Sequence, residues 1–500
     1  MIDKLDLNNL LSENERLEYK SCFNKLSKDV WETVSSFENT EGGYLILGIR
    51  EKDQAGNTVN DVKGLKEPQK ILDQFWSNID NVISYHNLDN NNIRYRHLDN
   101  GNTLIQIYIP AAPLNKQPVL YNNRPYIRKG TTDLEAKGED YKRLMLNTTE
   151  DLDTKVLQNY WLDDLDLETI NEYKRLLINR SSYQNYQDLD LQPFLERIGV
   201  ISKDYNGTGK KGLTVGGLLF FGKNNAIIHK FPEFQLEFFD QTSTTKRWDN
   251  RISSVAQNLN IFSFYQATTV ALFRTINNQF ELDERMVRKN TSSAMEIALR
   301  EALLNMLMHA NYYEKNSIRV YAKFNYYEFS NPGKMMIPVD EFFTSNLSKT
   351  RNPVISKLFV QLGLGERAGH GGEKIYESAI KNNYRVPEIS TDENQTKLKI
   401  WKVDFADSFS NQEINNRERS VLKAILSTPS HALNHKDIEN KTNLSRTIVT
   451  TTLNKLIDKK LITKIGNARS TKYSLQITET QLLAQMEVLP QIMREYLKNK

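Results

Sequence analysis

The sequence predicts a multidomain protein of mixed α/β and α+β class, and three observations support this prediction. Its 500 residues are too many for one hydrophobic core, because domains usually contain about 100–200 residues. Short apolar runs entered through glycines alternate with helical patterns over most of the chain. The C-terminal part then shows three short helical segments followed by a hairpin pattern. We therefore expect two α/β domains, a linking subdomain between them and a small helical unit near the C-terminus.

Composition excludes several classes of protein. The single cysteine, Cys22, rules out a disulfide framework and a cysteine-rich zinc site. No run of about 18 apolar residues occurs, and the first 20 residues are charged throughout, so we expect neither a membrane span nor a signal peptide. The protein is therefore expected to be cytoplasmic. Residues 411–500 carry 15 Lys and Arg against 8 Asp and Glu, whereas the whole chain has a net charge of only +4. Positive charge is thus concentrated at the C-terminal end.

Residues 1–148 predict an α/β domain. Residues 42–49 form a short apolar strand pattern behind two glycines, and residues 103–110 form a second one. Residues 118–128 predict a further pair of strands around Asn122-Asn123, because this dipeptide favours tight turns.

Residues 149–285 predict a linking subdomain with helices and strands. A helical pattern occurs within residues 151–180, and strands are expected at 212–222 and 233–240. The run from Gly217 to Asn224 matches the first seven positions of a phosphate-binding loop. Its intervening residues are bulky and apolar, and Asn224 replaces the hydroxyl residue that would ligate Mg²⁺. A strand is the better prediction for this run.

Residues 286–406 predict a second α/β domain. It contains a helix at 293–310, strands at 317–322 and 326–330, and a glycine cluster at 363–372. A polar segment, residues 407–416, follows and is typical of a linker.

Residues 411–476 predict a winged helix-turn-helix. Three helices are expected at 419–426, 436–442 and 445–459, and a wing hairpin is expected from strands at 461–465 and 472–475. Double-stranded DNA is the expected partner, with contacts from residues of the last helix and the wing. The residues expected to touch DNA are Ser445, Arg446, Thr447, Thr450, Arg469 and Lys472. A winged helix that docks a protein is the alternative. Residues 477–500 predict a C-terminal helix with an apolar stripe that another element or a second subunit would bury.

The helix at 293–310 contains a pattern that suits nucleotide chemistry. Glu301 and Asn305 are four residues apart and lie on one helix face, and His309 follows one turn later. A carboxylate can polarise water there, while an amide oxygen helps to hold Mg²⁺ against a nucleotide. The same spacing also occurs on solvated helices without function.

The order of further motifs favours the nucleotide site. After the helix come Ser330-Asn331-Pro332-Gly333, then Arg351-Asn352-Pro353, and then Gly365 to Gly372. This series resembles the divergent histidine-kinase-like (GHKL) ATP-binding domain of a family of bacterial transcriptional regulators, whose relatives are often labelled RecG-like helicases. The resemblance implies ATP and Mg²⁺ as cofactors, with Glu301 catalytic, Asn305 at the metal and Asn331 and Gly333 near the adenine. It further implies a lid whose backbone amides approach phosphate, formed by Gly369, Gly371 and Gly372. The family's adenine-reading aspartate is absent from the Ser-Asn-Pro-Gly run.

A second series of motifs lies near the N-terminus. Glu13, Glu18-Tyr19-Lys20, the run from Phe37 to Gly43 and the strand that ends near Glu51 and Asp53 follow one another in order. This series resembles the AlbA-2 domain shared by Schlafen proteins and many bacterial regulators, over about residues 10–130.

Two functions are open for this domain. In Schlafen nucleases, acidic residues bind a divalent cation that activates water, which would give this role to Glu13, Glu18 and Glu51 or Asp53, with Lys20 at the phosphate. Mg²⁺ or Mn²⁺ would then be the cofactor, and RNA or DNA the substrate. A nucleic-acid-binding or structural domain is the alternative, and a basic-aromatic stretch at residues 121–129 suits backbone contacts and base stacking.

These motifs lead to three hypotheses for the whole chain. The first is an ATP-binding, DNA-binding bacterial regulator in which the nucleotide pocket controls the winged helix, acting as a homodimer. The second is a metal-dependent nuclease that acts on RNA or DNA in antiphage defence. The third is a scaffold that binds a nucleotide only for stability.

Overall fold

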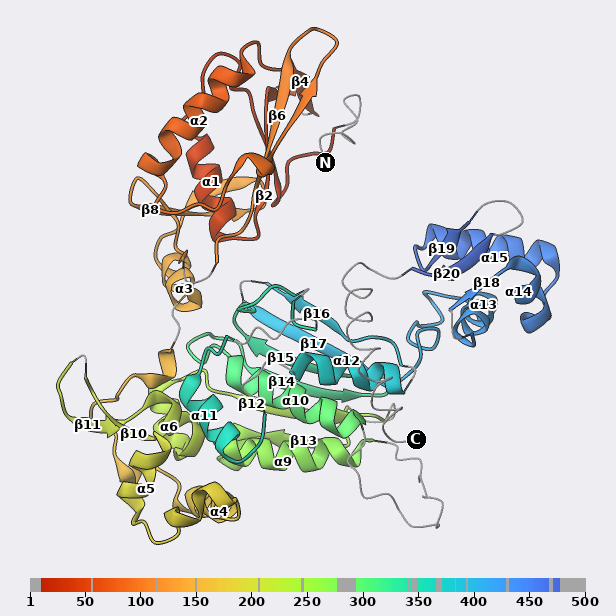
Figure 1. Cartoon of the computed structure of the whole chain (residues 1–500). Helices are drawn as coiled ribbons and strands as arrows, with labels where there is room; N and C mark the ends of the chain where they lie inside the picture. The colour runs from red at the N-terminus through yellow and green to blue at the C-terminus, as the bar shows by residue number, and fades with distance from the viewer. Residues whose placement is uncertain are drawn as a thin grey trace. The chain divides into compact units, whose positions relative to one another are not determined.

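The structure is a computed structural model, and its described residues fall into two compact units, 1–150 and 151–500 (Figure 1). It describes residues 10–54, 57–113, 116–148, 151–205, 207–243, 247–276, 294–339, 341–343, 349–365, 371–382, 384–392, 394–428, 431–466 and 471–476. Of residues 52–54, 57–59 and 146–148 it describes the backbone alone. Within these ranges, no helix has the length and apolar character needed to cross a membrane.

Unit 1–150 is built on a four-stranded sheet in the order β1-β2-β6-β5. The strands are β1 (Leu17–Lys20), β2 (Gly43–Leu47), β5 (Ile93–His97) and β6 (Thr103–Ile109). β1 and β2 run parallel, and the other pairs are antiparallel. Leu45 and Ile107 belong to the core that the sheet shares with helices α1 (Val30–Asn39) and α2 (Pro68–Val82). The strands expected at 42–49 and 103–110 are therefore confirmed.

Two smaller β-elements and a helix complete this unit. β3 (Ile49–Gln54) and β4 (Asn57–Val62) pair with each other, and β7 (Leu120–Tyr121), β8 (Arg124–Lys129) and β9 (Thr132–Glu135) form a small antiparallel sheet. Asn122 and Asn123 have positive φ angles in the turn between β7 and β8, as the sequence predicts. Helix α3 (Glu139–Thr148) ends the unit.

Unit 151–500 contains a six-stranded sheet in the order β13-β12-β14-β15-β17-β16. Its strands are β12 (Leu236–Gln241), β13 (Asn250–Ser253), β14 (Ile318–Lys323), β15 (Tyr326–Pro332), β16 (Glu388–Thr391) and β17 (Gln395–Trp401). Only β12 and β14 pair in parallel. Helices α9 (Ile261–Arg274), α10 (Ala294–His309) and α12 (Gly371–Lys381) pack on it.

The expected boundary near residue 285 falls inside this sheet. β12 and β13 come from the segment expected to form a separate linking subdomain, yet they extend the sheet that β14 begins. One hydrophobic core runs from Leu157 to Ile400. The reason is the parallel pairing of β12 with β14, which joins segments far apart along the chain.

The strand expected at 212–222 is mostly wrong. Only β11 (Lys211–Leu213) is extended, and it pairs with β10 (Ile201–Lys203), whereas helix α6 (Val215–Phe221) follows directly. Thr214 caps this helix, since its hydroxyl accepts a 3.1 Å hydrogen bond from the Gly217 backbone N–H. All residues of this apolar run are buried. A continuous apolar run is compatible with either a core helix or a core strand, so the sequence pattern did not distinguish them.

Further helices close the unit around its core. They are α4 (Leu167–Ile178), α5 (Leu191–Ile198), α7 (Asn224–Lys230), α8 (Ser254–Gln257) and α11 (Pro353–Gln361). The buried carboxylate of Asp153 accepts hydrogen bonds from the backbone N–H groups of Val354 (3.2 Å) and Ile355 (2.9 Å), so it caps α11 from 200 residues away along the chain.

Residues 416–475 contain the three helices and the hairpin that the sequence predicts. The helices are α13 (Asn416–Leu426), α14 (His435–Thr442) and α15 (Arg446–Asp458). Strands β18 (Ala432–Leu433), β19 (Ile462–Ile465) and β20 (Lys472–Leu475) form a sheet in the order β18-β20-β19. The helix expected within 477–500 lies outside the described residues.

Candidate functional site: a pocket beneath helix α10

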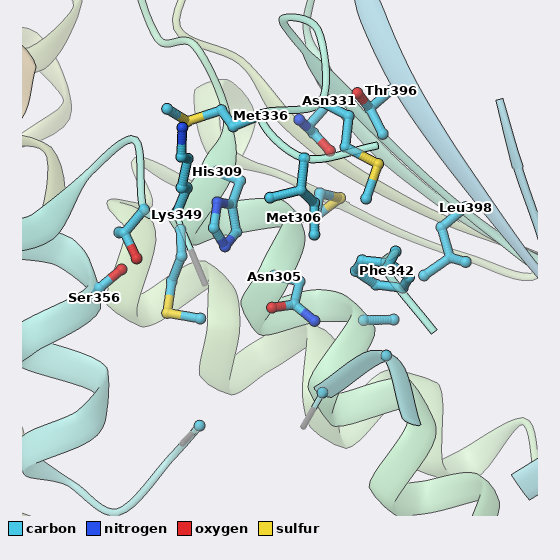
Figure 2. Close-up of a pocket in the computed structure, with 18 of the residues that line it drawn as sticks. Asn305, Met306, His309, Asn331, Met336, Phe342, Lys349, Ser356, Thr396 and Leu398 are labelled. Carbon is cyan, nitrogen blue, oxygen red and sulfur yellow. The ribbon is translucent and has the colours of Figure 1, made fainter. Parts of the chain in front are cut away.

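Helix α10 brings Glu301, Asn305 and His309 to one side, as their four-residue spacing requires. All three line a cavity of about 370 Å³. In Figure 2, Asn305, Met306 and His309 lie along the helix, and Asn331, Thr396 and Leu398 lie opposite on the strands. Such a volume is within the usual range for small-molecule sites. The structure therefore brings together the helix motif and the strand motif that the sequence singled out.

The strand side of the cavity is fixed by β15 and β17. The Asn331 amide donates a 3.2 Å hydrogen bond to the Pro332 carbonyl, and the Thr396 hydroxyl donates one of 2.9 Å to the Gly333 carbonyl. Gly333 has a φ of +94°, and a Cβ there would lie 2.9 Å from the Cβ of Asn311. Only glycine fits this position. Gly333 itself is not among the residues that line the cavity, and it forms the turn between Asn331 and Lys334, which do line it.

The other glycines expected in the lid are placed only in part. Gly371 and Gly372 begin α12 and line the cavity, whereas Gly369 lies outside the described residues. A Cβ on Gly371 would lie 2.9 Å from Asn305 Nδ2 and 3.2 Å from Glu301 Oε2. The backbone at the start of α12 is therefore in direct contact with the two polar groups of α10.

Three lysines also line the cavity, and sequence reasoning missed them. Lys334 follows the Pro-Gly turn, Lys349 precedes α11, and Lys357 lies within α11. These lysines belong to segments without a recognisable motif. Their position after Gly333 along the chain is the only sequence signal that could have assigned them to the pocket. Together with Glu301 they give the cavity wall an excess of positive charge, which suits a ligand with several negative charges.

Two buried basic groups have lowered pKa values near this wall. Burial lowers the pKa of His309 to about 4, with the nearby charge of Arg351 acting in the same direction. Burial also lowers the pKa of Arg351 to about 10, and its guanidinium donates a 2.7 Å hydrogen bond to the Lys334 carbonyl. His309 is thus neutral at pH 7, and Arg351 is charged and holds the segment that carries Lys334.

The acidic residues of unit 1–150 form a different arrangement. One carboxylate oxygen of Glu18 lies 2.6 Å from Arg128 Nη2, and the other lies 2.7 Å from Lys20 Nζ. The Lys20 ammonium is also 3.0 Å from Asp29, and Arg128 Nη1 is 2.9 Å from Asp133. We call these five residues the buried charge network. Both oxygens of Glu18 already bind cations, and Lys20 is held between two carboxylates.

Glu13 and Glu51 lie close enough to Glu18 for its negative charge to raise their pKa values. The pKa of Glu13 rises to about 7, because burial and the neighbouring carboxylates outweigh the 2.8 Å hydrogen bond that it accepts from the Tyr19 N–H. The pKa of Glu51 is raised by burial and by Glu18. Among the described residues, no group of three acidic, histidine or cysteine side chains has a geometry that could hold a metal ion. The side chain of Asp53 lies outside the described residues.

The motif from Phe37 to Gly43 has a structural role. Buried Asn39 donates hydrogen bonds to the carbonyls of Val119 (2.8 Å) and Tyr126 (2.9 Å) and accepts one from the Val119 N–H (2.7 Å). It therefore ties α1 to β7 and β8, rather than only capping the helix. Arg128, expected among surface residues of the basic-aromatic stretch, is buried. That expectation was wrong because Arg128 belongs to the buried charge network.

The helix α15 presents its N-terminal end to solvent. Ser445, Arg446, Thr447 and Thr450 are exposed, while Val449, Leu453 and Leu456 are buried in the core. Thr450 lies 2.9 Å from the ring of His435. Lys472 is exposed on β20, and Arg469 lies outside the described residues.

Comparisons with known proteins identify three segments. Residues 13–137 match the family described as "Schlafen, AlbA_2", and residues 316–400 match "Putative ATP-dependent DNA helicase recG C-terminal". Residues 142–237 match "Domain of unknown function (DUF8451)". No curated protein matches. A crystal structure of the DIP2311 protein from Corynebacterium diphtheriae is similar, with 16% identity, 92% of this chain and 95% of that chain covered, and a TM-score of 0.38.

The two motif series predict the same two families that these comparisons identify. Both are connected with nucleic acids, and the second is of an ATPase type. Residues 13–137 are thus similar to the Schlafen AlbA_2 family, and residues 316–400 are similar to the RecG C-terminal family.

Proposed function

We propose that this protein is an ATP-binding, DNA-binding regulator in which occupancy of the pocket beneath α10 controls the winged helix. The observation that carries the proposal is the cavity itself, which places Glu301 and Asn305 opposite Asn331 and beside lysines. ATP with Mg²⁺ fits this combination: Asn305 would help to hold the metal, and Glu301 would orient water. Lys334, Lys349 and Lys357 would face the phosphates.

The start of α12 would complete the phosphate site. Its first backbone N–H groups have no partner within the helix, and Gly371 is close to Asn305. A phosphate near Asn305 would therefore be within reach of a helix N-terminus, where negative charge is stabilised.

The proposed output is binding of double-stranded DNA through α15. Arg446 and Thr447 are exposed at the helix end that enters the major groove in helix-turn-helix proteins, and Lys472 suits a phosphate contact. Residues 411–500 carry the excess of positive charge that such binding needs.

A chain of contacts links pocket and output. Strand β17 lines the pocket with Thr396 and Leu398 and ends at Trp401. The Arg385 guanidinium lies over the rings of Trp401 (4.6 Å), Phe405 (5.4 Å) and Phe409 (5.0 Å). The two phenylalanines pack against the core beneath α13 and α15. A shift of β17 on nucleotide binding would therefore reach the DNA-binding helices.

Duplex DNA affinity, measured with and without Mg·ATP, tests this proposal. We expect the affinity to change about 10-fold, which corresponds to a coupling free energy of about 1.4 kcal/mol. Arg446→Ala should weaken duplex binding and lower the salt dependence by about one counterion, whereas Arg417→Ala on α13 serves as the matched control. Equal affinity with and without nucleotide would remove the proposed control and leave a nucleotide that serves stability alone.

A metal-dependent nuclease is a second candidate, because Glu18 and Glu51 are near enough to raise the pKa of Glu13, although the described residues contain no group of three side chains with metal-binding geometry. Incubation of the protein with labelled RNA and DNA and Mg²⁺ or Mn²⁺ tests it. Cleavage that is lost in Glu13→Gln would support a nuclease. Because Glu18 is already neutralised by Arg128 and Lys20, we rank this candidate second.

A further inference from the structure

The six-stranded sheet of unit 151–500 has two different faces. On one face, the side chains of Phe238, Val320 and Phe329 point into the core beneath the helices. The nucleotide pocket lies on this side. The side chains between them point the other way, because successive residues of a strand alternate across a sheet. We call this second side the outer sheet face.

The outer sheet face carries aromatic rings. Phe239 and Tyr321 are direct neighbours in the β12–β14 register, and their rings stack with centroids 5.2 Å apart and planes at 14°. Trp248 lies 6.0 Å from Phe239, and Tyr326 belongs to the same face through the β15–β17 register. In the part of the chain that the structure describes, these four rings belong to no hydrophobic cluster. Their arrangement is therefore not explained by core packing.

Cations lie over these rings. The Arg251 guanidinium is 5.4 Å from the Phe239 ring, Lys323 Nζ is 5.0 Å from Tyr321, and Lys399 Nζ is 4.8 Å from Tyr326. The strand registers add Arg319 and Lys397 to the same face.

Fewer carboxylates share this face. They are Glu237, Glu328 and Glu388. Glu237 is buried and bound to Arg251 at 2.9 Å, so it does not face a ligand. Positive charge therefore dominates a surface that also carries flat aromatic groups.

We propose that the outer sheet face binds single-stranded nucleic acid. Bases would stack on Phe239, Tyr321 and Tyr326, and phosphates would meet the surrounding lysines and arginines, a combination that single-strand binders use because every base has an aromatic face. Duplex DNA does not fit, because its bases are already stacked inside. A second copy of this chain fits less well, since it would bring one positive face against another. The surface lies on the opposite side of the sheet from the nucleotide pocket, and β17 contributes residues to both.

Fluorescence anisotropy with the full-length protein tests this proposal. The probes are a labelled 20-nucleotide oligo-uridine RNA, the matched oligo-thymidine DNA and a 20-base-pair duplex. The double variant Phe239→Ala/Tyr321→Ala should bind the single strands at least 10-fold more weakly, because stacking of each base on an aromatic ring contributes substantially to the binding affinity. Its affinity for the duplex should stay within twofold of the wild type.

A matched control is available on another part of the unit. Tyr205 is 81% exposed and has Lys203 Nζ 5.6 Å from its ring, so Tyr205→Ala removes a similar aromatic-cation pair away from the outer sheet face. It should leave single-strand affinity unchanged. Lys323→Gln/Lys399→Gln removes charge without removing a ring, so it tests the surface even if the aromatic variant does not fold. It should weaken binding about fivefold and reduce the salt dependence.

Three results would overturn the proposal. In the first, the folded double variant or the charge variant binds single strands with the same affinity as the wild type. Another is an equal loss in Tyr205→Ala. The third is a change in oligomeric state of the outer-face variants by light scattering with single-strand affinity intact, which would assign the face to a second copy.

Discussion

Unit 1–150 and the pocket of unit 151–500 use the same residue types in opposite ways. In the buried charge network, both oxygens of Glu18 contact cations, at 2.6 Å and 2.7 Å. In the pocket, Glu301 lies 3.9 Å from Lys374 and borders a cavity of about 370 Å³. The first arrangement satisfies its charges internally, and the second borders a space that a ligand can fill.

This difference shows that a motif identifies chemical groups and not their use. Glu18-Tyr19-Lys20 and Glu301-x-x-x-Asn305 both suggested catalysis from the sequence. The second pair borders the cavity of about 370 Å³, whereas Glu18 and Lys20 bind each other within the buried charge network. We therefore expect changes in the network to affect stability, and changes in the pocket to affect ligand binding.

The largest effect should follow Arg128→Ala. The side chain of Arg128 is 1% exposed and pairs with Glu18 and Asp133, so its loss removes the paired cation of Asp133 and leaves Glu18 with Lys20 alone. Breaking a buried pair in this way costs about 3–5 kcal/mol of folding free energy. Hydrogen exchange of α1 and β8 peptides in the full-length protein measures this loss.

Arg124→Ala is the control for that variant. Arg124 lies on the same strand, but its side chain is 63% exposed and 3.6 Å from Glu135. Exposed pairs contribute about 0–1 kcal/mol, so little change is expected. Equal protection in Arg128→Ala and wild type would show that the network does not stabilise the unit.

A smaller effect, on binding alone, should follow Gly371→Ala. The new Cβ would lie 2.9 Å from Asn305 Nδ2 and would displace this flexible amide. We expect Mg·ATP affinity to fall about 10-fold, or about 1.4 kcal/mol, while the melting temperature stays nearly unchanged. A large loss of melting temperature with intact affinity would contradict the ligand role of this contact.

An effect on the pH dependence of stability concerns Glu38, a carboxylate of unit 1–150 outside the charge network. Burial raises its pKa from 4.5 to about 8, and the nearby Asn87 backbone lowers the pKa by a smaller amount. The folded chain therefore holds a proton that the unfolded chain releases between about pH 4.5 and 8. The stability due to this group is present below pH 4.5 and is lost as the pH rises towards 8, with a slope of about 1 kcal/mol per pH unit.

Glu38→Gln tests this prediction, since glutamine keeps the shape of the neutral acid. The variant should show a flatter dependence of unfolding free energy on pH between 5 and 8, measured by hydrogen exchange of α1. An unchanged slope would show that Glu38 does not hold its proton in the folded state.

The sequence predicts local features better than distant ones. Glu301 and Asn305 share a helix face because of their spacing, and the β7–β8 turn follows from Asn122-Asn123, so both were predictable. The parallel pairing of β12 with β14 was not, because it joins strands more than 70 residues apart without a local signal. The helix at α6 was missed because a buried apolar run suits either element, although Thr214 is a typical N-cap.

The pocket lysines illustrate the same limit. The fold around α11 brings three lysines, Lys334, Lys349 and Lys357, to the same cavity as Glu301 and Asn305. Their positions in the sequence do not show this. Likewise, the sequence suggests that Arg128 is a surface residue of a basic-aromatic stretch. In the structure it lies on β8 and binds the Glu18 carboxylate. The fold decides which charges are neutralised.

The most direct test of the contrast between the two regions is calorimetric titration of Mg·ATP into three proteins. We predict binding at one site in the wild type, at least 10-fold weaker binding in Asn305→Ala, and wild-type affinity in Glu18→Gln. This prediction would be contradicted by a wild-type protein that binds no Mg·ATP, or by equal affinity in Asn305→Ala.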